Sequence, residues 1–298
     1  MTKEKDVLQK YNIIPKKISY KNKLKIITTS TNVYCLKVKE NQITDVYEYL
    51  RNHNFNNYIP LISDSSDPYE IYPYISEKNI DKESKALELI YTLSLLHTKT
   101  TTYKELNLEQ IKEKYEKISN EINKLLLYYY DLQDYIETNE YMSPAEYYLI
   151  RNMNKLYISL NNAKHDIDKW YKLKEKETQE RQVLLHNKIS LEHFIKSENN
   201  YLINWNKSCK GNVVYDFLNF FKNDYKILEM ENLFELYQTK YPYTEDEKYL
   251  FKALLQIPWK ITFKETNYVN TLKVKELLDY LEKANHLILK NDEKNQKA

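Results

Sequence analysis

Short runs of β-branched and aromatic residues, separated by polar breaks, fill the first quarter of the chain, and this pattern is typical of strands. The predicted strands cover residues 18–20, 24–28, 33–38, 58–63 and 69–75. A helix is predicted over residues 43–52, because the apolar positions there recur at helical spacing. Together these elements predict an antiparallel sheet with one helix in residues 1–75.

Two long segments farther along the chain carry apolar residues in a four-three alternation, which is the pattern of helices that pack along a seam. The first seam runs from Ile111 to Ile136, and the second runs from Leu149 to Trp170. Two helices of similar length with a short loop between them predict an antiparallel hairpin over residues 105–178. We expect the helices to pack on each other and on the core, and a part of this seam is also a candidate surface for a protein partner.

The sequence between the two seams contains the residues typical of a helix start. Ser143 is predicted as the N-cap, Pro144 as the first helical residue, and Glu146 as the residue that completes a capping box. Strand-like residues return at 183–185 and 201–205, and the chain is then helical with a break at 257–259. The fold class predicted from these patterns is α+β, with a larger helical part over residues 76–298.

Composition and charge narrow the classes of function. The 298 residues include 45 Lys and Arg against 43 Asp and Glu, a formal net charge of +2, so nothing global indicates binding to nucleic acid or to an anionic membrane. No run approaches the roughly 20 apolar residues of a membrane span. A charged N-terminal segment argues against a signal peptide, and we expect a cytoplasmic protein.

The numbers of glycines and cysteines exclude two kinds of binding site. The only glycine is Gly211, and a single glycine rules out the glycine-rich phosphate loops of nucleotide-binding proteins. The two cysteines, Cys35 and Cys209, cannot build a four-ligand zinc site by themselves and favour a reduced intracellular chain.

The segment from Val183 to His193, followed by residues 201–205, has the shape of a phosphotransferase catalytic loop and metal-binding strand. It follows a strand that carries Lys37 and a helix that ends at Leu96-His97-Thr98. In this order the chain resembles the aminoglycoside phosphotransferase and choline kinase-like group and, within it, the bacterial spore-coat kinase-like proteins. The resemblance spans residues from about 15 to 280, and its motifs are confined to these four short stretches.

The resemblance implies a protein-kinase-like fold of two lobes, with a small sheet-rich lobe at 1–75 and a helical lobe at 76–298 that contains the loop region 183–205. It implies that Lys37 holds nucleotide phosphates, with Glu48 on the next helix as its ion-pair partner. His97 and Asp216 are expected to support the loop, and His186 is the histidine of the loop itself. Association with spores is a further implication of the spore-coat branch.

The residues that should carry out the chemistry are replaced. A site of this kind needs a carboxylate to orient the substrate hydroxyl, and an Asn and an Asp to hold magnesium. Lys188 stands where the carboxylate should be, and an ammonium with a pKa of about 10.4 cannot accept a proton at neutral pH. His193 and Asn204 stand at the two magnesium positions, and magnesium strongly prefers oxygen ligands with charge.

The sequence therefore predicts a catalytically degenerate, pseudokinase-like protein that acts as a binding or scaffolding module and holds no metal. The alternative is an atypical small-molecule phosphotransferase whose rewired site uses Glu192, His186 or His193. In the first case Lys37 and Lys188 would bind ATP or another anion without magnesium. A helical adaptor unrelated to kinases is a third class, and it would lack the strand-rich first lobe.

Overall fold

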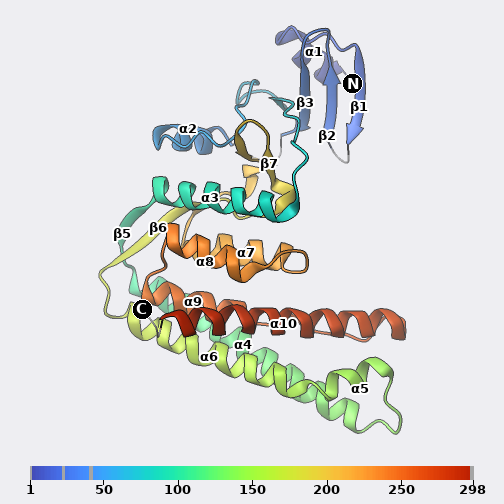
Figure 1. The fold of residues 1–298 in the computed structure, drawn as a ribbon, viewed down its shortest axis with the longest axis vertical. Helices are drawn as coiled ribbons and strands as arrows, with labels where there is room; N and C mark the ends of the chain where they lie inside the picture. Colours follow the sequence, from blue (N-terminus) through green and yellow to red (C-terminus); the bar gives the residue numbers. More distant parts are fainter. Residues whose placement is uncertain (1, 22–23, 40–42, 296–298) are drawn as a thin grey trace. The chain divides into compact units, whose positions relative to one another are not determined.

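The computed structural model describes residues 2–21, 24–39 and 43–295 (Figure 1). The chain forms two compact units, and each is built from two stretches of sequence. The first unit contains Met1–Thr101 and Val183–Gly211, and the second contains Thr102–Gln182 and Asn212–Ala298. The predicted class, a small antiparallel sheet joined to a larger helical part, is confirmed.

The first unit is organised by a four-stranded antiparallel sheet with the order β1-β2-β3-β4. Its strands are β1 (Lys17–Lys21), β2 (Leu24–Thr28), β3 (Val33–Val38) and β4 (Tyr69–Pro73). These four confirm the predicted strands, but the strand predicted over 58–63 is wrong. In that segment only Tyr58 forms a bridge, to Leu202, because Pro60 has no backbone N–H to continue a ladder.

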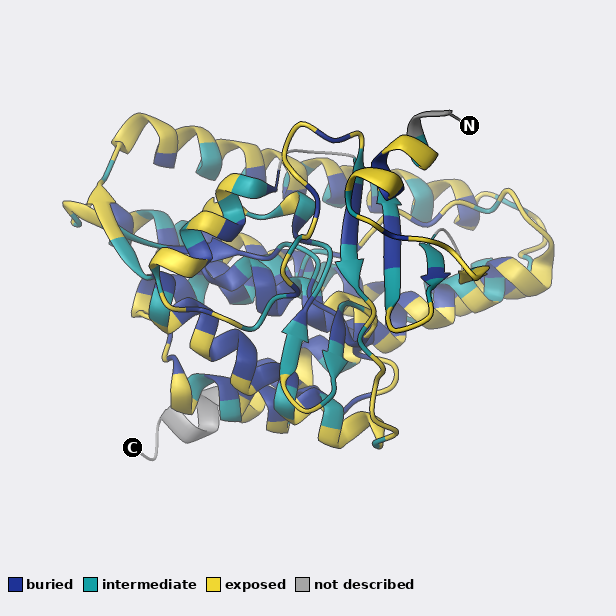
Figure 2. Cartoon of the chain, turned by 90° about the horizontal axis from the view of Figure 1, so that it is seen from above, coloured by how far each residue is buried: buried dark blue, intermediate teal, exposed yellow. Residues whose placement is uncertain are grey.

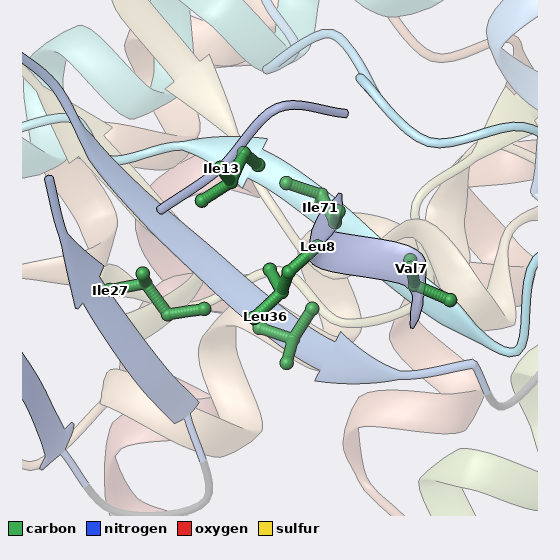
Figure 3. Packing of buried hydrophobic residues seen from close by; sticks show 6 residues of the cluster. All are labelled: Val7, Leu8, Ile13, Ile27, Leu36 and Ile71. Atoms are coloured by element: carbon green, nitrogen blue, oxygen red, sulfur yellow. The ribbon is translucent and has the colours of Figure 1, made fainter. Parts of the chain in front are cut away.

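One face of this sheet is covered by α1 (Thr2–Lys10), a helix that the sequence pattern did not predict. Its Val7 and Leu8 pack with sheet residues Leu36 and Ile71 in a buried apolar cluster (Figure 3). The helix end is fixed by Lys10, whose Nζ lies 2.8 Å from a carboxylate oxygen of Asp64. Two apolar positions among nine residues are too few to give a helical period.

Two further helices belong to the first unit. The predicted helix after the third strand is present as α2 (Thr44–Asn52). The helix α3 (Lys82–Thr100) begins at Asp81, whose side chain accepts a 2.8 Å hydrogen bond from the Ser84 N–H. One face of α3 is buried, from Ala86 to Thr100, as expected for a helix packed on the rest of the unit.

The loop region is attached to the sheet-bearing unit through backbone and ionic contacts. Its hairpin consists of β7 (Phe194–Lys196) and β8 (Asn200–Leu202). The Leu202 N–H donates a 2.8 Å bond to the Asn57 carbonyl, and Lys196 lies 2.9 Å from a Glu88 carboxylate oxygen on α3. These contacts hold the loop region in the same compact unit as the sheet.

The strand β6 (Gln179–Leu185) leads from the second unit into the loop region. Its first residues pair with β5 (Thr102–Glu105), and its last three pair with β9 (Cys209–Gly211). The strand predicted at 183–185 is therefore the end of a longer one, and its polar first half carries no apolar alternation.

The second unit is built around the predicted antiparallel hairpin. Its helices are α4 (Leu108–Glu137), α5 (Pro144–Ile150) and α6 (Met153–Lys174), and α4 and α6 lie side by side (Figure 1). The antiparallel register follows from cross-helix hydrogen bonds, because Tyr115 pairs with Asp168 while Gln133 pairs with Tyr157. The capping box at Ser143 is present as predicted, but a break separates α5 from α6.

The predicted seam is buried inside the second unit. All seven predicted seam residues of the second segment are buried, as are most of those on α4 (Figure 2). The unit is completed by α7 (Val214–Asp224), α8 (Met230–Lys240), α9 (Glu245–Leu255) and α10 (Asn267–Asn295). The predicted break at 257–259 separates α9 from α10. Across the described part of the chain, no helix combines the length and apolar character that a membrane span requires.

Candidate functional site

The loop that follows β6 is anchored by a buried histidine. The Nε2–H of His186 donates a 2.8 Å hydrogen bond to the Ile203 carbonyl. The His186 ring packs edge-on against Trp205, with 4.7 Å between ring centroids, and the Trp205 indole N–H donates to the Leu202 carbonyl. These contacts tie the loop to the strand that carries Asn204 and make His186 a structural residue in this unit.

Left-handed backbone in the loop region is provided by asparagine. Asn187 has a φ of 60° and Asn204 a φ of 66°, and every described residue other than glycine with positive φ is an asparagine. Asparagine adopts this conformation more easily than most residues do. Asn204 thus has a conformational reason to be an asparagine, which is independent of any metal.

Lys188, which the sequence motif aligns with the catalytic carboxylate, is half-buried. Its Nζ donates a 2.8 Å hydrogen bond to Oδ1 of Asn206, just after the Asn204 position. Its backbone carbonyl accepts a 2.7 Å bond from Nδ1 of His193. The loop therefore closes on itself through an amide, an ammonium and an imidazole. Neither Asn206 nor these pairings were predicted.

His193 is held as a neutral ring with a defined tautomer. Because Nδ1 donates to the Lys188 carbonyl, the proton of the neutral ring lies on Nδ1 and Nε2 is the basic nitrogen. Burial lowers the pKa of His193, and the charges of Lys188 and Lys37 lower it further, against the opposing effects of the Lys188 carbonyl and Glu192. The charges of two lysines thus favour the neutral form of the His193 imidazole.

Lys37 lies on β3, directly opposite Glu70 on β4. Residues in this relation share one face of a sheet, with their Cβ atoms about 5 Å apart. The Glu70 side chain is only 4% exposed and accepts a 2.9 Å hydrogen bond from the Tyr72 hydroxyl. Glu48, the predicted partner of Lys37, is exposed on α2. The sequence analysis did not consider Glu70, because the β3–β4 register was not yet known.

The surroundings of Lys37 are polar but hold few ionised groups. On the same face of β3, Cys35 is a buried free thiol, and burial raises its pKa to about 11. Burial also raises the pKa values of Tyr47 and Tyr72 above their usual range, and the Glu70 charge adds to both effects. Glu70 is thus the carboxylate that the β3–β4 ladder places beside Lys37.

Magnesium does not fit the residues of the loop. The described ranges, 2–21, 24–39 and 43–295, contain no group of three or more His, Cys, Asp or Glu side chains suited to a metal. His193 turns Nδ1 onto the Lys188 carbonyl, and the ammonium of Lys188 belongs to the same hydrogen-bonded loop. Glu192 is exposed on the short helix Leu191–His193. A divalent cation here would face a lysine and neutral donors.

The two remaining candidates for loop support lie in different units. His97 is fully buried on α3 in the first unit, and Asp216 is fully buried on α7 in the second. The burial fits the structural role expected of both residues.

Comparison with solved structures shows the fold. An aminoglycoside phosphotransferase from Alicyclobacillus acidocaldarius subsp. acidocaldarius DSM 446 is similar over 97% of this chain and 92% of that chain, with a TM-score of 0.65 and 11% identity. The AMP-bound spectinomycin phosphotransferase APH(9)-Ia covers 94% and 96%, with a TM-score of 0.54 and 13% identity. Aminoglycoside phosphotransferase APH(4)-Ia covers 96% and 97%, with a TM-score of 0.51 and 10% identity. The sequence matches no protein-family model and no curated protein.

Proposed function

We propose that this chain is a degenerate phosphotransferase-fold protein that binds an anionic ligand without magnesium and does not transfer phosphoryl groups. It would act as a binding or scaffolding module. The observation that carries the proposal is the hydrogen-bonded ammonium of Lys188 in the loop position where a carboxylate would orient the substrate hydroxyl.

Loss of transfer follows from the charge at this position. An ammonium that is protonated at neutral pH cannot take the substrate proton, and the neutral donors of His193 and Asn204 attract a divalent cation weakly. Contributions to charge stabilisation in phosphoryl transfer are worth factors of about 10³–10⁵. Removal of the carboxylates from this loop therefore removes most of the expected rate.

Retention of an anion site follows from the lysines. Lys37 and Lys188 belong to the first unit, and the charge of each lowers the pKa of His193. Lysine ammonium groups bind phosphate oxygens as point charges. Two such groups beside a neutral imidazole would replace the charge that magnesium supplies to a nucleotide.

The proposal is tested by calorimetric titration of the full chain with ATP, once with EDTA and once with magnesium. The expected result is binding of similar affinity in both, because the lysines and not a metal neutralise the phosphates. Binding that requires magnesium, or no binding under either condition, contradicts the anion site.

A second experiment restores the missing charges. The variant Lys188→Asp with Asn204→Asp should gain magnesium-dependent ATP binding, because two carboxylates then stand in the loop region. The matched control is Lys207→Asp with Asn199→Asp, which makes the same change of charge at exposed neighbouring positions. Magnesium dependence in the control as well would mean that added negative charge alone explains the gain.

The alternative function, an atypical small-molecule phosphotransferase, is favoured by one observation. The neutral His193 ring carries its proton on Nδ1, so Nε2 is the basic nitrogen. A general base requires this state. His186 is fully buried, whereas His193 is partly exposed, so His193 is the better base of the two. Transfer of the ATP γ-phosphate to small alcohols and amino sugars, abolished in His193→Gln, would establish this function in place of the first.

We also propose that the chain belongs to the bacterial spore-coat kinase-like branch and works in the cytoplasm or on the spore. The four motif stretches at 34–38, 93–98, 186–193 and 202–205 support this placement. Immunodetection in fractions of sporulating cells tests it, and a protein confined to vegetative cells would contradict association with spores.

A further inference from the structure

The turn end of the helical hairpin, where α5 packs against α10, differs in composition from the rest of the chain. We call residues 125–150 the hairpin end; they comprise the last part of α4, the following loop and α5 (Figure 1). This segment contains no Lys, Arg or His, although the chain has 45 Lys and Arg. Its carboxylates are Asp131, Asp134, Glu137, Glu140 and Glu146. Its tyrosines are Tyr128, Tyr129, Tyr130, Tyr135, Tyr141, Tyr147 and Tyr148.

The hairpin end is ordered by a buried face. Tyr129 is fully buried and its hydroxyl donates a 2.5 Å hydrogen bond to the Trp259 carbonyl, while Ile136 is also fully buried. These two residues lie on the side of α4 that carries the seam. The opposite side of the helix is therefore a formed surface on a rigid element.

That opposite side exposes large apolar and aromatic groups. Leu127 is 62% exposed, Tyr135 is 63% exposed, and Tyr141 in the loop is 83% exposed. Asp131 and Asp134 are exposed between them on the same side of α4. Contiguous exposed apolar groups with polar neighbours mark interaction surfaces. The seam is buried by packing within the second unit. The outer face is therefore the part of the hairpin that a partner can contact.

The carboxylates are placed where they weaken the helix. The C-terminal end of a helix carries partial negative charge, so cations stabilise it and anions destabilise it. The last turn of α4 has no basic residue, and Asp134 and Glu137 lie within its final turn or so. The first half of the same helix, by contrast, exposes Lys112 and Lys117. Sequences keep locally unfavourable residues mainly at functional sites.

This charge selects the partner. Nucleic acids and anionic membranes are repelled by a segment with five carboxylates and no cation, whereas lysine and arginine side chains are attracted. Such side chains also place their stems and charged groups on tyrosine rings. The chain shows this contact itself, because the Arg151 guanidinium lies 5.6 Å from the Tyr147 ring centroid and donates a 2.8 Å hydrogen bond to its hydroxyl.

We propose that the hairpin end is a docking surface for a Lys/Arg-rich segment of another polypeptide. The exposed carboxylates of α4 pair with the cations, and the exposed tyrosines receive the side-chain stems and the guanidinium planes. This inference does not depend on the proposed function, since it uses no residue of the loop region.

The test uses fluorescein-labelled octa-arginine and measures anisotropy with the full chain at about 0.15 M ionic strength. The variant Asp131→Asn with Asp134→Asn and Glu137→Gln should weaken binding about tenfold, as expected when three exposed ion pairs are lost. The matched control is Glu113→Gln with Glu116→Gln and Glu121→Gln, which removes three exposed carboxylates from the first half of the same helix. It should change the dissociation constant less than twofold.

The aromatic contribution is tested separately with Tyr135→Ser and Tyr141→Ser together. Binding of octa-arginine should weaken about fivefold, since two cation–π contacts are lost. The control is Tyr103→Ser with Tyr268→Ser, two exposed tyrosines outside the hairpin end, which should leave binding unchanged. Circular dichroism of each variant confirms that the helices remain formed.

Several outcomes would overturn the proposal. Equal weakening in the hairpin-end and control variants would mean that the peptide binds any acidic surface of the chain. Binding of octa-glutamate or of phosphatidylserine vesicles at the hairpin end would identify a different class of partner. Salt-sensitive self-association that is lost in the triple carboxylate variant would show that the occupant is a second copy of the chain, whose first residues are rich in lysine.

Discussion

The helical hairpin of the second unit and the loop at 186–205 of the first are both ordered by sequence, but by different kinds of signal. In the hairpin, a repeated apolar period buries Leu156, Leu160 and Ile167 along one seam. In the loop, order comes from single polar contacts, such as the bond from Lys188 to Asn206 and that from His193 to the Lys188 carbonyl. The hairpin is thus stabilised by the apolar surface that it buries. The loop is stabilised by hydrogen bonds that depend on the identity of each residue.

This difference separates stability from function. A buried seam position contributes several kcal/mol whichever apolar residue fills it well, whereas a net hydrogen bond contributes about 1 kcal/mol. Substitutions in the hairpin seam should therefore unfold the chain, and substitutions in the loop should mainly change what it binds.

The largest effect is expected in the seam. Leu160 is fully buried on α6, so Leu160→Ala should lower the free energy of unfolding by about 3 kcal/mol through lost burial and a cavity. Denaturant unfolding followed by circular dichroism measures it. The control, Ile158→Ala, lies on the same helix with an exposed side chain and should cost less than about 0.5 kcal/mol. Similar losses at both positions would mean that the seam does not carry the stability.

A smaller effect with the opposite sign is expected at Lys114 on α4. Its ammonium lies 5.2 Å from the Trp170 ring and 5.1 Å from the Tyr215 ring. Burial lowers the pKa of Lys114 to about 8, partly offset by the charges of Glu180 and Asp246. At neutral pH the folded chain therefore holds a charge that burial disfavours. We expect Lys114→Met to raise the free energy of unfolding by about 2 kcal/mol at pH 7.

The pH dependence of this difference has a definite sign. Between about pH 8 and 10.4 the unfolded chain binds the Lys114 proton and the folded chain does not, so the wild type gains stability as pH rises. The advantage of Lys114→Met should shrink over that window. The exposed control Lys112→Met should show no such trend. An advantage that stays constant from pH 7 to pH 10 would contradict the lowered pKa.

In the loop, a conformational effect of about 1 kcal/mol is expected at Asn204, whose φ is 66°. Asn204→Ala should lower the free energy of unfolding by that amount, while Asn204→Gly should be nearly neutral because glycine adopts positive φ without strain. Thermal unfolding measures both. The exposed Asn199→Ala is the matched control, since its φ is not positive. Equal losses for Ala and Gly at position 204 would assign the effect to the amide side chain.

The same contrast explains what the sequence predicted. The seams, the Ser143 capping box and the four sheet strands depend on neighbours within one element, and all are confirmed. The contacts of Glu70 and Asn206 depend on register and loop geometry, which no local period encodes, and they were not foreseen. The helix α1 owes its state to packing against distant sheet residues, whereas the strand predicted at 58–63 fails for a local reason, because Pro60 has no backbone N–H.

The smallest effect on stability, and the largest on binding, is expected at Lys188. Its ammonium makes one half-buried hydrogen bond to Asn206, so Lys188→Met should lower the free energy of unfolding by at most about 1 kcal/mol. A charge-assisted bond to a phosphate is worth about 1.5–3 kcal/mol, so metal-free ATP binding should weaken between about tenfold and a hundredfold.

Calorimetric titration with ATP in EDTA measures that loss, and denaturant unfolding of the same sample measures stability. Lys207→Met is the control, because it removes an exposed lysine from the same segment without touching the loop contacts. If Lys188→Met unfolds the chain, the ammonium is a structural residue and the contrast between hairpin and loop fails. If it leaves ATP binding unchanged while the fold persists, the anion binds elsewhere. Lys188 would then replace a carboxylate without binding the anion itself.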